Sequence, residues 1–199
     1  MNRVQKNCWI GVWLAFSAAT ISAEPMSQLD RQRLLAHLAL TGDWLRDEVA
    51  NLSKAQLEYR PSPDSWTVAE VVQHLVLAEP NYWKLLQDGV QRAPAELKQK
   101  ATDADVLWYG IDRTRRDKTP QRQDPKGQDV RIADALKSYS DLHAKMVEYA
   151  KTTQDDLRAH TVPEWGVDAY QCLLEISTHE ERHILQIREI KASAGFPKK

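Results

Sequence analysis

The chain has 199 residues, enough for one ordinary domain with its own hydrophobic core. Its 27 basic and 28 acidic residues are interspersed and give a formal net charge of −1, which is typical of a solvated globular surface. This balance lacks the basic surface that nucleic-acid binding requires, so we expect no nucleic-acid partner.

The first 23 residues differ in kind from the rest. Arg3 and Lys6 precede about 14 nearly uninterrupted apolar residues, CWIGVWLAFSAATI, the pattern of a secretory signal peptide. A membrane helix needs about 20 residues, so this run is short for one. We predict cleavage after Ala23, export to the periplasm or the medium, and a mature domain over residues 24–199 without membrane attachment. An uncleaved anchor is the alternative, because Ile21 is a weaker residue than alanine at its position before the cleavage site.

Two cysteines are present, Cys8 and Cys172. Cys8 would leave with the signal peptide, so no intramolecular disulfide can form in the mature chain. Cys172 lies in an apolar stretch with helical periodicity. We predict a buried, inert thiol at this position.

The first half of the mature chain predicts two helices, and no convincing β-type alternation is found. The helix over 27–50 has one apolar stripe, formed by Leu34, Leu38, Thr41, Leu45 and Val49. Pro61 and Pro63 then impose extended backbone. Thr67 and Glu70 fit a capping box that begins a second helix, which runs to about residue 87 and is expected to kink at Pro80.

Residues from about 88 to 128 are polar and predict an irregular connection that ends in RTRRDKTPQRQDPKG. So long a loop is unusual in a compact domain. A loop of this length is explained if the helices before and after it are parallel, because the chain must then return along the length of the bundle. We expect Trp108 and Tyr109 to pack part of this crossover on the body, and the RTRR cluster to be solvated.

Two further helices are predicted over 130–153 and 168–194, separated by a turn at VPEWG. Asp168 and Gln171 mark the start of the last helix. Four helices and one long crossover between the second and the third predict an all-α four-helix bundle.

Histidines fall on the inner faces of these helices. His179 and His183 lie one turn apart on the face of Ile176 and Ile187, so both can reach one ion inside the bundle. His74 also points inward, and His143 is a possible inward neighbour on the helix over 130–153. One such histidine is ordinary, since it can donate to a carbonyl group. Three are harder to explain without a ligand, because each unpaired buried nitrogen costs about 1–3 kcal/mol.

The segments DSWTVAEVVQHL, VPEWG and YQCLLEISTHEERHILQIREIKASAGFP resemble the DinB-like superfamily of metal-binding four-helix bundles. The resemblance covers residues 28–197. It implies an up-down-down-up topology and possible homodimers. It also implies a divalent ion, commonly zinc or nickel, held by His74, His179 and His183.

Three neutral imidazoles leave a coordination position for water, whose pKa would fall toward about 7. We therefore predict a metal-dependent, hydrolytic enzyme that acts on a small molecule. The resemblance leaves a thiol-dependent transferase or isomerase open, and a non-catalytic metal-binding protein is a further alternative. HEERH matches the zinc-protease motif H-E-x-x-H, but few residues follow His183 and no sheet is predicted, which disfavours a protease.

Glu175 and Glu180 are weak candidates for proton transfer. Glu180 follows His179 directly and so points about 100° around the helix from it. Glu175, one turn before His179, and Gln186, three residues after His183, are better placed to orient the imidazole N–H groups.

Overall fold

The computed structural model describes residues 26–97, 101–115 and 118–198, so the predicted signal peptide lies outside the described residues. The all-α prediction is confirmed, with one small addition, a two-stranded antiparallel ribbon in which Thr161 pairs with Asp168. The elements are α1 (Gln28–Val49), α2 (Lys54–Leu57), α3 (Val68–Gln91), α4 (Asp103–Ile111), the 3₁₀ turn η1 (Gln121–Gln123), α5 (Ile132–Thr152), β1 (Thr161–Val162), β2 (Val167–Asp168) and α6 (Ala169–Lys191).

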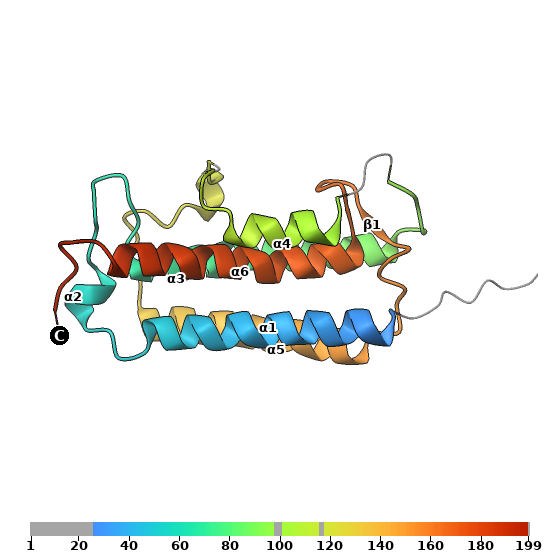
Figure 1. Ribbon diagram of the computed structural model, residues 1–199, viewed down its shortest axis with the longest axis horizontal. Helices are drawn as coiled ribbons and strands as arrows, with labels where there is room; N and C mark the ends of the chain where they lie inside the picture. Colours follow the sequence, from blue (N-terminus) through green and yellow to red (C-terminus); the bar gives the residue numbers. More distant parts are fainter. Residues whose placement is uncertain (1–25, 98–100, 116–117, 199) are drawn as a thin grey trace, which may run out of the picture.

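Helices α1, α3, α5 and α6 form the four-helix bundle. α1 and α6 run in one direction while α3 and α5 run in the other, the predicted up-down-down-up topology (Figure 1). α1 and α3 each pack against both α5 and α6. The parallel pair α3 and α5 explains the long crossover, because the chain travels back along the bundle between them.

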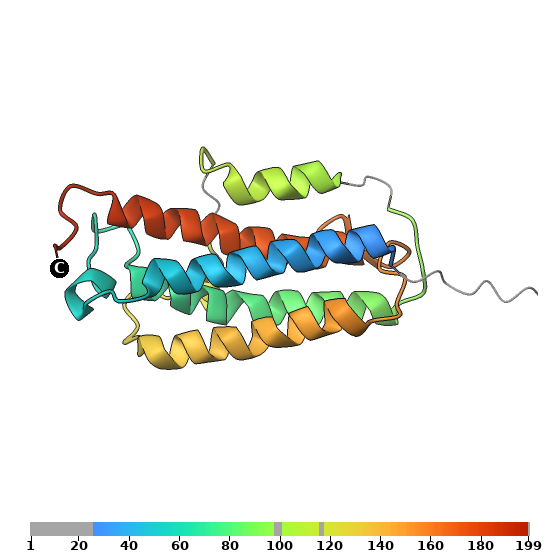
Figure 2. The same ribbon diagram turned by 60° about the horizontal axis from the view of Figure 1, so that its bottom comes forward.

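The crossover is more ordered than predicted. α3 continues to Gln91, and the chain then forms α4, which lies against α6 outside the bundle (Figure 2). A capping box starts α4: the Thr102 hydroxyl accepts from the Asp105 N–H at 3.1 Å, and the Asp105 carboxylate accepts from the Thr102 N–H at 2.8 Å. Tyr109 is half-buried as expected, but Trp108 was expected to pack on the body and is instead 62% exposed.

Close contact between α4 and α6 depends on Gly110. A Cβ atom at this position would lie 3.1 Å from the carbonyl oxygen of Thr178 and 3.0 Å from its Cβ. Glycine therefore allows the two backbones to approach, and α4 covers the part of α6 that carries the histidines.

Helix α6 is surrounded by α1, α3 and α4 and is buried almost all round. Residues 169–174 and 176–180 are buried without interruption, so the polar side chains of THEER lie largely inside the protein. The predicted stripe of α1 is buried as expected. Cys172 is fully buried, and burial raises the pKa of its thiol. No helix in the described ranges combines the length and apolarity needed to cross a membrane.

Candidate metal centre

The first turn of α3 fixes the position of His74. The predicted capping box is present: the Thr67 hydroxyl accepts from the Glu70 N–H at 3.1 Å, and the Glu70 carboxylate accepts from the Thr67 N–H at 2.8 Å. Glu70 also accepts from Arg60 at 2.6 Å and from the Gly127 N–H at 2.9 Å. Burial alone would raise the pKa of Glu70, but these hydrogen bonds outweigh it and lower the pKa. The carboxylate thus joins α3 to the end of the crossover.

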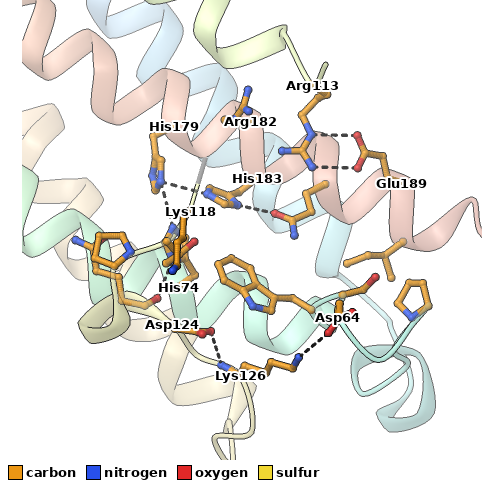
Figure 3. A pocket seen from close by; sticks show the side chains of 18 of the residues that line it. Asp64, His74, Arg113, Lys118, Asp124, Lys126, His179, Arg182, His183 and Glu189 are labelled. Atoms are coloured by element: carbon orange, nitrogen blue, oxygen red, sulfur yellow. Dashed lines mark hydrogen bonds and ion pairs between the residues drawn. The ribbon is translucent and has the colours of Figure 1, made fainter. Parts of the chain in front are cut away.

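The structure brings the three predicted histidines together. His74 from α3 and His179 and His183 from α6 direct their Nε2 atoms toward one point. The Nε2 atom of His179 lies 3.2 Å from that of His74 and 3.1 Å from that of His183 (Figure 3). All three side chains are buried, with at most 8% exposed.

Hydrogen bonds at the opposite ring nitrogens fix two of the tautomers. The Nδ1 atom of His74 lies 2.8 Å from the carbonyl oxygen of Gln123, which can only accept, so His74 carries its proton on Nδ1. The Nδ1 atom of His183 lies 2.8 Å from Oε1 of Gln186, which assigns the same tautomer. The Nε2 atoms of His74 and His183 therefore present lone pairs toward the shared point.

Burial keeps these imidazoles neutral. Desolvation is the main cause that lowers the pKa of all three, and it lowers those of His179 and His183 well below the ordinary value. The Nε2 atoms of His74 and His183 carry lone pairs and no proton. Only Nε2 of His179 can carry a proton, and that single proton cannot satisfy all three converging nitrogens. The Nδ1 atom of His179 is also buried without a hydrogen-bond partner. A cation at the shared point would satisfy all three Nε2 atoms, so the donor set fits a divalent ion.

A cavity of about 610 Å³ opens over the three rings. Trp66 forms one wall, with its ring centroid 4.9 Å from that of His74 and 6.1 Å from that of His183. Tyr82 packs edge-to-face on His179 at 5.0 Å. The rim carries charges of both signs, labelled in Figure 3: Asp64, Arg113, Lys118, Asp124, Lys126, Arg182 and Glu189.

Two rim arginines hold the crossover against α6. Arg113, expected in a solvated loop, pairs with Glu189 through two contacts of 3.0 Å. Arg182 donates to the carbonyl oxygens of Tyr109, Asp112 and Arg115. These contacts place the crossover over the cavity, and the sequence did not indicate them.

Of the two residues predicted to orient the imidazoles, one contacts a histidine ring nitrogen and the other does not. Gln186 makes the predicted contact with His183. Glu175 does not accept from Nδ1 of His179, which has no partner. It lines a second cavity of about 410 Å³ that also includes His179. Burial raises the pKa of Glu175 to about 7, although Arg182 opposes the shift.

Glu180 does not face the histidine cavity, so the structure gives no support to its role in proton transfer there. Its carboxylate accepts from the Thr41 hydroxyl at 2.5 Å and from Nδ1 of His143 at 3.0 Å. His143 points inward as expected but joins this network between α1, α5 and α6, not the three histidines. Burial alone would lower the pKa of His143, yet its hydrogen bond to Glu180 raises it.

Comparisons with known proteins bear on the family and the fold. The family model of the DinB superfamily matches residues 37–187. The uncharacterized protein YuaE of Bacillus subtilis (strain 168) is 24% identical over 149 residues, which covers 73% of this chain and 89% of that protein. The solved structure of YfiT from Bacillus subtilis, described as a probable metal-dependent hydrolase with an unusual four-helix bundle topology, superposes with a TM-score of 0.58. It is 17% identical, with 86% of this chain and 91% of YfiT covered.

Proposed function

The chain belongs to the DinB superfamily, and from that premise we propose that it is a metal-dependent hydrolase of small molecules. One divalent ion, zinc or nickel, would be held by Nε2 of His74, His179 and His183. The observation that carries the proposal is the convergence of these three neutral nitrogens. The Nε2 atom of His179 lies 3.2 Å from that of His74 and 3.1 Å from that of His183. The description of YfiT as a probable metal-dependent hydrolase supports it.

The ion, when bound, would lower the pKa of a water molecule into the neutral range. The protein supplies the remaining requirements for hydrolysis. Gln123 and Gln186 hold the rings of His74 and His183 with Nε2 toward the ion. Trp66 and Tyr82 shield the ligands from bulk water, and the cavity of about 610 Å³ provides space for a substrate.

Elemental analysis of the purified protein tests the metal site. We expect about one divalent ion per chain, with most of it lost in His74→Ala and in His183→Ala. His160→Ala is the matched control, because His160 lies outside the cluster and contacts the Arg92 carbonyl. Full metal retention in both cluster variants would refute the assigned ligands.

Hydrolysis of a panel of small esters and amides, before and after treatment with a chelator, tests the activity. We expect turnover that is lost with the ion and restored by zinc or nickel. Metal binding without turnover of any substrate, with or without an added low-molecular-weight thiol, would instead support a non-catalytic metal protein. Turnover that requires the thiol would support the transferase alternative.

A further inference from the structure

The second cavity, of about 410 Å³, shares a wall with the histidine cavity. His179, Tyr82 and Tyr109 line both. His179 therefore faces the candidate ion through Nε2 while its ring also borders the second cavity. The two cavities are therefore direct neighbours at these three side chains.

Aromatic rings dominate the walls of the second cavity. The Trp165 ring lies 4.6 Å from the Tyr82 ring at 80°, so their planes are nearly perpendicular. Tyr82 in turn contacts His179 edge-to-face, and Tyr109 completes the aromatic lining. Trp165 belongs to the VPEWG turn between β1 and β2, which the proposed hydrolysis does not otherwise use. Gly166, with φ +68, allows the turn that presents this tryptophan.

The charges in the two cavities differ. The histidine cavity has four cationic residues on its rim. Among the described residues that line the second cavity, the acidic side chains are Glu175 and Asp105, and none is lysine or arginine. Asp105 is held as a carboxylate, because hydrogen bonds from the Thr102 side chain and backbone lower its pKa. Arg182 does not line this cavity: it donates to three crossover carbonyls and stacks on the Tyr109 ring at 4.8 Å.

Perpendicular aromatic rings with adjacent acidic side chains are the chemistry that recognises organic ammonium groups. We propose that the cavity lined by Tyr82, Tyr109, Trp165 and Glu175 binds an alkylammonium group of the substrate, while the scissile bond lies at the three histidines. This assignment rests on the proposed function for the position of the reacting group. The ammonium site itself is a property of the cavity and can be tested without turnover.

The test is binding of tetramethylammonium to the metal-loaded protein, compared with neopentyl alcohol, a neutral compound of similar shape and size. Calorimetry or saturation-transfer NMR measures both. We expect the cation to bind about tenfold more tightly than the neutral compound, because cation–π attraction in a partly desolvated site is of this order. Equal binding of the two compounds, or preference for the neutral one, would overturn the proposal.

Four variants locate the binding. Trp165→Leu and Glu175→Gln are each expected to remove most of the preference for the cation, whereas Trp165→Phe keeps an aromatic ring and most of the preference. Trp108→Leu is the matched control, because Trp108 is 62% exposed on α4 and does not line either cavity. Circular dichroism checks that each variant is folded. An unchanged preference in folded Trp165→Leu and Glu175→Gln would overturn the assignment.

Turnover separates this proposal from the hydrolase proposal. We expect acetylcholine to be hydrolysed with a higher kcat/KM than 3,3-dimethylbutyl acetate, its neutral counterpart, by about tenfold. Tetramethylammonium binding without turnover of any ester or amide would refute the hydrolase and leave the ammonium site intact. Hydrolysis of neutral and cationic esters at equal rates, without tetramethylammonium binding, would refute the ammonium site and leave the hydrolase intact.

Discussion

Glu79 in α3 is a fully buried carboxyl group, and neither of its oxygens has a hydrogen-bond partner. Burial, and secondly the nearby Glu180 carboxylate, raise the pKa of Glu79 well above its ordinary value of 4.5. In the unfolded chain Glu79 loses its proton near pH 4.5, whereas in the folded protein it keeps that proton to higher pH. We predict that Glu79→Gln, which is neutral at every pH, increases the stability of the folded protein at neutral pH.

The sign and size follow from proton linkage. Above pH 4.5 the folded state binds one more proton at Glu79 than the unfolded state does, so each pH unit lowers the free energy of unfolding by about 1.4 kcal/mol. This loss stops where pH reaches the raised pKa. Glutamine removes the slope, so the gap between variant and wild type should be small at pH 4.5 and widen with pH. One pH unit corresponds to about 3–6 °C in Tm for a domain of this size.

Equilibrium urea denaturation at half-unit steps from pH 4.5 to 8, with a chelator present throughout, measures this gap. The histidines titrate alike in both proteins, so their effect cancels in the difference. Glu148→Gln, an exposed site on α5, is the control and should follow the wild type. Parallel stability curves for Glu79→Gln and wild type would refute the argument that Glu79 is protonated in the fold.

Three further predictions test other contacts. Gly42→Ala should destabilise the protein in urea denaturation, because the added Cβ would lie 2.7 Å from Nε2 of His143. Overpacking of this kind costs about 1–3 kcal/mol, whereas the higher helix propensity of alanine returns about 1 kcal/mol. A variant more stable than the wild type would contradict this prediction. Glu70→Gln should lose about 1.5–3 kcal/mol at pH 7. The folded pKa of Glu70 is lowered, so that stabilisation is present above pH 4.5 and is lost as pH falls through the folded pKa. The gap between the two denaturation midpoints should therefore narrow steadily as pH falls below 4.5, and a gap that stays constant with pH would exclude this origin. Gln186→Leu should weaken metal affinity about 10- to 100-fold in competition with a chelating dye, and unchanged affinity would show that the contact with His183 does not matter.

The sequence predicted what depends on local pattern. Helical spacing placed His74, His179 and His183 inside the bundle, and the capping residues Thr67 and Asp168 marked two helix starts that the structure reproduces. The resemblance to the DinB-like superfamily supplied the topology. The helix faces and helix starts depend on side-chain periodicity and on capping of the free backbone N–H groups. Both are determined by residues close together in the sequence.

Features that depend on contacts between distant segments were missed. Glu180 was expected to point about 100° around α6 from His179. That position would be solvated if α6 had an exposed face there. Glu180 is buried because it faces α1 and α5 inside the bundle, where its carboxylate contacts Thr41 and His143. α4 itself was missed, although Thr102 and Asp105 form a capping box, because nine residues give little periodicity. The carbonyl oxygen of Gln123, which fixes His74, has no side-chain signal at all.

The three histidines come from two helices far apart in the sequence, and His179 stands 105 positions after His74. During synthesis the first imidazole is therefore made long before its two partners, and the backbone oxygen that orients it comes from the crossover between them. An ion met by the nascent chain would find a single ring with no defined geometry. At the proposed metal site, capture of an ion would accordingly follow closure of the bundle, and the compartment in which the polypeptide finishes folding would determine which metals the site meets.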